Sequence, residues 1–381
     1  MHRRSAALAL LGIVLACSWQ AIAVHTTYHG NWTGLFCAGD HFTRPPEMQS
    51  GEYVFHSSSG YDGQFYQLIA HDPLLQRHYY WYIDAPRLRY RRILMPGLAG
   101  LLVGEQFEWI DASNILVCWL FIGLGTFCLA ELAVEAGRSV WWGLLFLVTP
   151  ATLLGIERMT VDVSLTALTL AALLAAHRQR WLLLWLTLAG AMLSKETGVI
   201  VIAATVFWLA RQKRFRLAVW MGLSALPAIG WYAFVQSHTR GDYSTAGFKF
   251  ITPFFAILNV PLDPGFPSLL FRIVTVIAVA GLLWAAVRSV VLAVQDHLCG
   301  IEAILSFCFA ALVLLFQNAS IWGDPDGFPR IYSPLLVCLI AATWREGFAQ
   351  TLAQFAMVAC PIGMQLGWDL ARPVLGLWIT R

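Results

Sequence analysis

Apolar runs close to the length of a membrane-spanning helix recur along most of this 381-residue chain. A bilayer core of about 30 Å takes roughly 20 helical residues to cross, and a spanning helix satisfies its own backbone hydrogen bonds. Hydrophobic residues make up 58% of the chain and charged residues only 12%, with a mean hydropathy of +0.64. A soluble globule of this length would leave too much apolar surface in water, so the sequence predicts an all-α, polytopic transmembrane protein.

About eleven spans are expected. The first, near residues 6–24, could be a cleaved signal peptide, but residues 17–20 make a poor cleavage site and we favour a retained helix. The run at residues 93–104 is too short to cross and contains Pro96-Gly97, which predicts a re-entrant or interfacial helix. The other spans are expected near residues 115–133, 139–155, 162–176, 181–194, 198–210, 217–236, 268–288, 301–317, 331–344 and 350–366.

No fixed-period repeat or linker divides the chain, so residues 1–381 are expected to form a single transmembrane domain with a large first loop at residues 25–92. Short cytoplasmic loops carry excess Lys and Arg. This rule predicts a cytoplasmic N-terminus and a first loop outside the cytoplasm. The residues it places inside are Arg3, Arg4, Arg138, Arg178, Arg180, Arg211, Lys213, Arg214, Arg216, Arg288 and Arg345.

The net charge of +3 is too small to indicate a nucleic-acid partner. Most of the eight Cys residues lie inside apolar runs and no CxxC pair occurs, so neither a disulfide framework nor a cysteine metal site is predicted. Histidines of the first loop do not have zinc spacing. The aromatic run at residues 79–82 is expected in an interfacial belt, with stacking on sugar rings as the alternative.

Ionisable residues gather at the span ends that are predicted to lie outside. Such groups are costly near hydrocarbon and usually face a cavity and pair with each other, which makes them functional candidates. In the alternative interpretation, Glu157 with Arg158 and Lys195 with Glu196 merely neutralise each other at the interface. The set comprises Asp40, Asp62, Asp72, Asp84, Glu157, Arg158, Asp162, Lys195, Glu196, Asp324, Asp326 and Arg330.

Within the first loop, Asp62 lies in the segment Gly60-Tyr61-Asp62-Gly63-Gln64-Phe65-Tyr66. Glycines on both sides would allow close backbone approach to a substrate and a turn that exposes the carboxylate. Alternatively, Asp62 is a turn residue that caps a helix beginning near Gln64.

That segment, followed by Ile69-Ala70-His71-Asp72-Pro73, Asp84, Arg89-Tyr90-Arg91-Arg92-Ile93-Leu94 and Pro96, resembles the first-loop signature of a group of bacterial GT-C-type membrane glycosyltransferases. The resemblance continues at residues 157–162, in Ser194-Lys195-Glu196-Thr197 and in Arg330-Ile331-Tyr332. It covers the layout of most of the chain, and its specific part is the first loop.

The resemblance implies a hexosyltransferase of the bacterial inner membrane with its active site facing the periplasm. Its donor would be a polyprenyl-phosphate-linked sugar, and its acceptor a surface glycan, glycolipid or protein. The essential acid of the family maps to Asp62, with Asp40 as a competing position. The first loop lacks Asp-x-Asp, and the similar pair Asp324-Pro325-Asp326 lies far downstream, so a divalent cation stays possible and no other cofactor is expected.

In this mechanism Asp62 is the general base that deprotonates an acceptor hydroxyl. The groups aimed at the phosphate are Arg91, Arg92, Lys195 and Arg330, although Arg91 and Arg92 could instead anchor lipid headgroups. The other residues expected to contact substrate are Tyr61, Gln64, Tyr66, Asp72, Asp84, Arg89, Asp162 and Glu196.

Two other classes of function fit a polytopic chain: a transporter or flippase of lipid-linked sugar, and a noncatalytic scaffold. A transporter places ionisable groups or broken helices near the midplane of the membrane. Here the charges lie at span ends on one side under a large loop, which favours an enzyme.

Overall fold

The computed structural model of the chain describes residues 2–104, 106–239, 268–315, 322, 326–344 and 347–374. Their regular structure is helical apart from one pair of two-residue strands, as expected of an all-α protein. The α-helices are α1 (His2–Thr27), α2 (Gly63–His71), α3 (Pro86–Arg89), α4 (Leu94–Val103), α5 (Ile110–Glu135), α6 (Pro150–Arg158), α7 (Asp162–His177), α8 (Trp181–Ser194), α9 (Gly198–Arg211), α10 (Phe215–Gly222), α11 (Leu226–His238), α13 (Ser268–Gln295), α14 (Ile301–Leu315), α16 (Gly327–Ile331), α17 (Ser333–Ala342) and α18 (Phe348–Val374). The 3₁₀ helices are η1 (Trp32–Phe36), η2 (Pro46–Met48), η3 (Tyr79–Tyr82), η4 (Phe107–Trp109), η5 (Val140–Val148) and η6 (Leu223–Ala225), and the strands are β1 (Ala38–Gly39) and β2 (Val54–Phe55).

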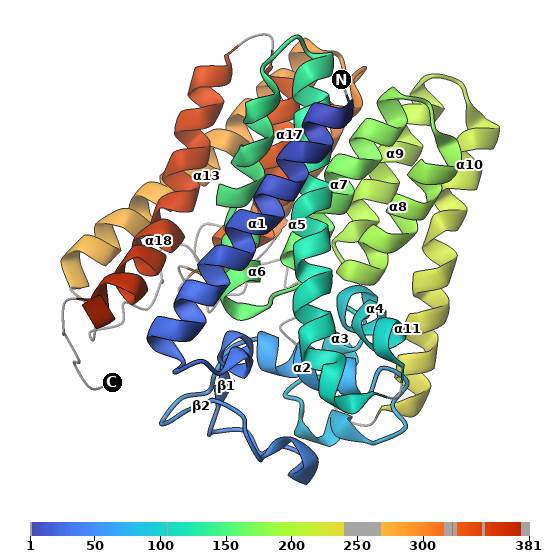
Figure 1. Ribbon diagram of the computed structural model, residues 1–381. Coiled ribbons are helices and arrows are strands. Elements are labelled where there is room, and N and C mark those ends of the chain that lie inside the picture. Colours follow the sequence, from blue (N-terminus) through green and yellow to red (C-terminus); the bar gives the residue numbers. More distant parts are fainter. Residues whose placement is uncertain are drawn as a thin grey trace.

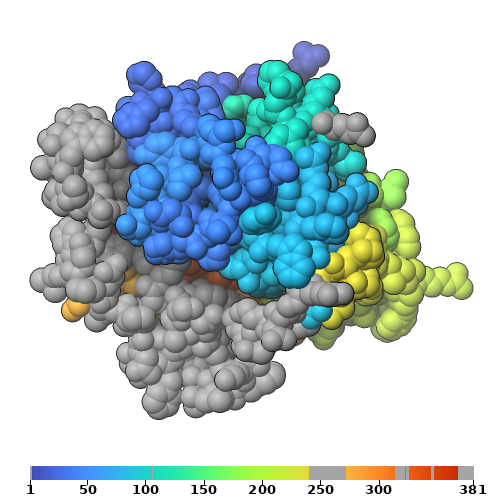
Figure 2. All heavy atoms as spheres, turned by 90° about the horizontal axis from the view of Figure 1, so that it is seen from below, coloured from blue at the N-terminus to red at the C-terminus, as the bar shows by residue number. Residues whose placement is uncertain are grey.

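The long helices form a bundle with the first loop gathered at one end. Figure 1 shows the N-terminus at the opposite end of the bundle from β1, β2, α2 and α3. The two strands pair in parallel, with Ala38 opposite Val54. Seen from below, the first loop covers much of this face (Figure 2).

Four described helices are long and apolar enough to cross a membrane: His2–Thr27, Phe107–Glu135, Phe215–His238 and Arg272–Gln295. The pair η5 and α6 would add a fifth span, but it bends by 57°. The described residues thus belong to a helical membrane protein. The expected count of eleven spans stays a prediction, since the remaining apolar helices are shorter.

The span expected at residues 139–155 is broken at Thr149 for a local reason. Pro150 disfavours helical geometry in the residue before it, and Thr149 has ψ 142°. The Thr149 side chain then accepts from the Thr152 amide, so Thr149 caps α6 while Pro150 takes the first helical position. The break directs α6 toward the loop end of the bundle.

Helices α7, α8 and α9 have 16, 14 and 14 residues. At 1.5 Å per residue they are roughly 21–24 Å long, which is less than a bilayer core. The start of α7 and the junction between α8 and α9 lie inside the protein under the first loop (Figure 1). Asp162, at the start of α7, and Lys195, between α8 and α9, are both buried.

The first helix is built into the bundle. Gln20 of α1 is fully buried, donates to the Ile156 carbonyl at 2.7 Å and accepts from the Trp119 indole at 2.6 Å. These contacts join α1 to α5 and α6; that the first helix is retained stays a prediction. Close packing continues at Gly125 of α5, where a Cβ would lie 2.2 Å from the Phe146 ring of η5.

Residues 93–104 form the single short helix α4, as the apolar run predicts. It packs against α2 and α5 through buried residues such as Met95 and Ala99, while Leu101 and Leu102 are exposed. The aromatic run at residues 79–82 is divided, because Tyr79 and Tyr80 are buried and Trp81 is 64% exposed.

Candidate functional site

Asp62 is positioned by close backbone packing of the first loop. The Tyr61 amide donates to the Cys37 carbonyl at 2.9 Å. Gly60 has φ +66°, and a Cβ there would lie 2.4 Å from the same carbonyl. A Cβ at Gly63 would lie 2.2 Å from the Arg158 carbonyl of α6. The glycines therefore allow approach to the chain's own backbone, and not the approach to a substrate that the sequence suggested.

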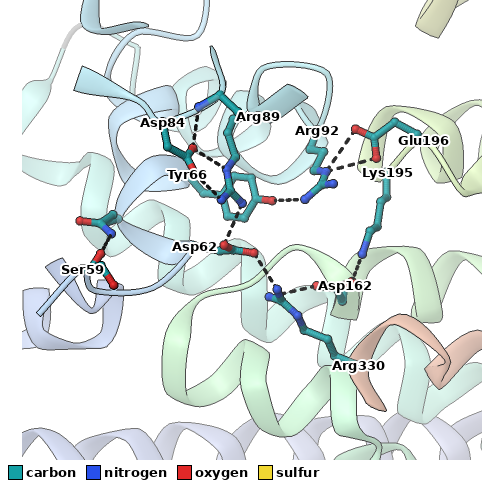
Figure 3. Close-up of polar contacts among 12 residues, drawn as sticks. Ser59, Asp62, Tyr66, Asp84, Arg89, Arg92, Asp162, Lys195, Glu196 and Arg330 are labelled. Carbon is teal, nitrogen blue, oxygen red and sulfur yellow. Dashed lines mark hydrogen bonds and ion pairs between the residues drawn. The ribbon is translucent and has the colours of Figure 1, made fainter. Parts of the chain in front are cut away.

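The Asp62 carboxylate does not cap α2. Asp62 precedes Gly63 with helical φ and ψ and makes no side-chain capping bond, so the capping interpretation is wrong. Instead, Oδ1 lies 2.8 Å from NH1 of Arg89, and Oδ2 accepts from NH2 of Arg330 at 2.8 Å (Figure 3). Residues from α3 and α16 thus meet at one carboxylate.

The two guanidinium groups set the electrostatics of Asp62. Burial by itself raises the pKa of this carboxyl, but Arg89 and then Arg330 outweigh it and hold the pKa well below its usual range. A general base works best with a pKa near the operating pH. In this state Asp62 is therefore a weak base.

Arg89 is held from its other side by Asp84. Its Nε and NH2 donate to the two Asp84 oxygens at 3.0 and 2.9 Å, a bidentate arrangement. The guanidinium carbon also lies 4.9 Å from the Phe65 ring centroid. Burial would lower the pKa of Arg89, but the neighbouring carboxylates raise it overall, so the side chain stays charged.

Arg330 is shared between Asp62 and a second ion pair. Its NH1 lies 3.6 Å from Oδ2 of Asp162, whose Oδ1 accepts a short hydrogen bond from the Lys195 ammonium. Figure 3 shows Arg330 between the two carboxylates. Both Asp162 and Lys195 are buried, so each depends on the other to remain charged.

Arg92 extends the cluster toward the junction of α8 and α9. Its Nε donates to both Glu196 oxygens at 3.2 Å, and its NH1 donates to the Tyr66 hydroxyl at 2.9 Å. The side chain is only 13% exposed, so the lipid-anchor alternative is wrong for Arg92. Arg91 lies apart, with its guanidinium carbon 5.3 Å from the Tyr232 ring centroid.

A further ion pair joins two functional candidates, Arg158 and Asp326, that were not assigned a contact with substrate. NH1 of Arg158 lies 2.6 Å from Oδ2 of Asp326. The Tyr61 ring connects this pair to the cluster, with the guanidinium carbons of Arg158 and Arg330 at 4.5 and 5.0 Å from its centroid. Both charged residues are in the set of ionisable groups at span ends that the sequence marked as candidates, but their pairing with each other was not predicted.

These contacts also replace the pairs expected from sequence neighbours. Arg158 pairs with Asp326 and not Glu157, whose Oε1 accepts from the Trp19 indole at 3.1 Å. Within the described residues we call the whole set the ion-pair network. It joins five carboxylates and five cations: Asp62, Asp84, Asp162, Glu196 and Asp326, with Arg89, Arg92, Arg158, Lys195 and Arg330.

Three predicted residues hold the loop and are not in this network. Asp40 accepts from the amides of Ser57 and Ser58 at 2.8 and 3.1 Å, and these bonds lower its pKa. Gln64 donates to the Ser59 carbonyl at 2.8 Å. Asp72 accepts from the Arg77 and Tyr79 amides.

The structure offers no evident ligand set for a divalent cation. Among the described residues, no group of three or more His, Cys, Asp or Glu side chains could hold a metal ion, and each carboxylate of the network is paired with Lys or Arg. Asp324 lies outside the described residues. His71 binds Asp111 of α5 through Nε2 at 3.0 Å.

Comparisons of this chain with protein-family models, curated proteins and solved structures found no match.

Proposed function

We propose that this protein is a membrane glycosyltransferase that moves a sugar from a polyprenyl-phosphate donor to an acceptor outside the cytoplasm. The observation that carries the proposal is the meeting of the partly exposed Asp62 carboxylate with several largely buried cations under the first loop. Transfer from a lipid phosphate requires these two kinds of group: a base for the acceptor and fixed positive charge for the leaving phosphate.

Asp62 would accept the proton of an acceptor hydroxyl as its oxygen attacks the anomeric carbon. The bond between that carbon and the phosphate oxygen breaks, and the phosphate leaves with the electron pair. Arg89 and Arg330 are the cations nearest to Asp62, with Arg92 and Lys195 beyond them. Fixed cations near developing negative charge can each contribute a few kcal/mol to transition-state stabilisation.

An apolar pocket beside α6 supports a sugar donor that carries a lipid tail. It has a volume of about 210 Å³ and is lined by residues of α1, η5, α6 and α18, including Trp19 and Ile156. Trp19 donates to Glu157, which immediately precedes Arg158 of the ion-pair network. Part of a prenyl chain in this pocket would lie beside α6, whose last residue, Arg158, belongs to the network.

The distribution of basic residues supports a site on the non-cytoplasmic side of the membrane, which is the periplasm in the proposed bacterial inner membrane. Arg138 donates to the Trp344 carbonyl, Arg178 binds Glu135 of α5, and Arg211 donates to the His297 carbonyl. These contacts lie at the end of the bundle where α1 begins, opposite the first loop (Figure 1). The positive-inside rule would place that end in the cytoplasm.

The test is reconstitution in liposomes with radiolabelled polyprenyl-phosphate sugars and extracted surface glycans or glycolipids. Wild type is expected to form labelled product, and Asp62→Asn to form none at equal folded yield. Asp40→Asn is the matched control, because this carboxylate of the same loop binds backbone amides. Movement of the donor across the bilayer without product would favour a flippase. Product formed by Asp62→Asn would place the base elsewhere.

A further inference from the structure

Each arginine that binds Asp62 also forms an ion pair with a second carboxylate. Arg89 donates to Asp84 through Nε and NH2, which leaves its NH1 for Asp62. Arg330 directs NH2 to Asp62 while its NH1 faces Asp162 at 3.6 Å. If Asp62 moved away, both guanidinium groups would remain oriented by these other partners, with one N–H donor each aimed at the place that Asp62 had occupied.

That place has the chemistry of a phosphate subsite. A phosphate group offers several oxygens, and guanidinium groups bind them with charge-assisted hydrogen bonds. The Asp62 side chain is 18% exposed, whereas that of Asp162 is 5% exposed, so Asp62 is the partner of Arg330 that an incoming ligand reaches more readily.

We infer that the Asp62 carboxylate occupies the phosphate subsite in the free protein, and that the phosphate of a lipid-linked donor displaces it from Arg89 and Arg330. The inference rests on the proposed function for the lipid-linked phosphate. It adds that donor binding controls the base, since the same exchange releases the carboxylate to face the acceptor.

A phosphodiester carries one negative charge, as the carboxylate does, so it can take the place of that charge between Arg89 and Arg330. The released carboxylate then lies beside an added anion and without these two cationic partners. The released carboxylate loses the two partners that depress its pKa, and its basicity rises as a result. Asp62 is then a competent base only when a donor is present.

Asp84 is a less suitable group to be displaced, although its side chain is 33% exposed. It makes two hydrogen bonds to Arg89, whereas Arg330 faces Asp62 and Asp162, so the departure of Asp84 would free donors on Arg89 only. Displacement of Asp62 frees one N–H group on Arg89 and one on Arg330, and both face the same place. One phosphate can therefore replace one carboxylate there.

The experiment is calorimetric titration of the full-length protein in detergent with farnesyl phosphate and, separately, with inorganic phosphate. Because Asp62 competes with the ligand, Asp62→Asn is expected to bind farnesyl phosphate about fivefold or more tightly than wild type. Arg330→Gln should bind farnesyl phosphate more weakly, since a charged hydrogen-bond donor to the phosphate is lost. Asp40→Asn should match wild type.

Unchanged or weaker binding by Asp62→Asn would overturn the inference, as would a larger gain in Asp84→Asn. Equal affinity for farnesyl phosphate and inorganic phosphate would overturn the lipid-linked part. A structure of the wild-type protein with farnesyl phosphate provides a test that needs no variant: phosphate oxygens bound to both Arg89 and Arg330 support the exchange, and Asp62 still bound to both contradicts it.

The outcomes separate this inference from the proposed function. Tighter binding by Asp62→Asn without any sugar transfer by wild type would support the subsite and contradict the transferase. Transfer by wild type together with unchanged binding in Asp62→Asn would support the transferase and contradict the exchange.

Discussion

Asp62 and its arginines show how a side chain's partners decide its chemistry. The same carboxylate would be a plausible base in a solvated loop, but Arg89 and Arg330 hold its pKa well below the usual range. Ion pairs so deeply enclosed are costly to break by removing one partner, because the other charge stays buried. Substitutions in the network will therefore affect both ligand binding and stability, and each needs a control for folding.

Arg330→Gln is expected to reduce sugar transfer by about 100-fold, the size of effect seen when one donor to a developing negative charge is removed. Radiolabelled product formation in liposomes would measure it. Arg77→Gln is the control, since this arginine of the first loop has its guanidinium carbon 5.0 Å from the Phe107 ring centroid. Equal losses in both variants would argue against a specific role for Arg330.

The ion pairs of Asp62 also predict how stability changes with pH. The folded-state pKa of this carboxyl lies below its unfolded value of about 3.9, so the pairs stabilise the protein above that pH and lose their effect as the pH falls toward the folded-state pKa. At pH 5–7, wild type should unfold at a higher temperature than Asp62→Asn. The free energy of unfolding should differ by roughly 1–3 kcal/mol. In thermal-unfolding curves, the difference should begin to shrink below about pH 4 and continue to shrink as the pH falls further. A constant difference down to pH 3 would contradict this assignment.

The contact between the start of α2 and the end of α6 couples the loop to the helical bundle. All nine residues of α2 are buried, which is unusual for a helix in a connecting loop. Gly63 meets the Arg158 carbonyl, and Arg158 itself belongs to the ion-pair network. The position of Asp62 relative to Arg330 therefore depends on this backbone contact as well as on the charges.

Gly63→Ala should weaken that contact, because the added Cβ would lie 2.2 Å from backbone atoms that cannot rotate away. Overpacking of this kind costs about 1–3 kcal/mol, and we expect a lower unfolding temperature and reduced transfer. Gly230→Ala in α11 is the control, since nothing lies within 4 Å of its Cβ. Native-like stability of Gly63→Ala would show that the loop can shift without cost.

The two ends of the bundle differ in charge and in covering. One end carries the first loop and the ion-pair network, and the other carries basic residues in short connections between helices. Cys299, in the exposed turn between α13 and α14, lies near His297, the acceptor of Arg211 at this second end. It provides a natural reporter for the orientation of the chain.

A membrane-impermeant maleimide should label Ser50→Cys, an exposed position in the first loop, in cells whose outer membrane has been removed and whose inner membrane is intact. Cys299 should react only after the membrane is permeabilised. The label that appears after permeabilisation should be lost in Cys299→Ser, and mass spectrometry of the labelled peptide would assign it to this position. Labelling of both positions from the same side would contradict the proposed topology.

The sequence alone was sufficient for the helical membrane class, the large first loop and most members of the charged site. Apolar runs and isolated charges at their ends carry that information, because hydrocarbon excludes unpaired ionisable groups. The sequence did not determine which charged residues form ion pairs. Lys195 binds Asp162 and not its neighbour Glu196, and Arg158 binds Asp326, which lies 168 positions further along the chain. Such pairings depend on distances between helix ends. Only the tertiary structure, which bends η5 against α6 and packs Gly63 on Arg158, brings these ends together around Asp62.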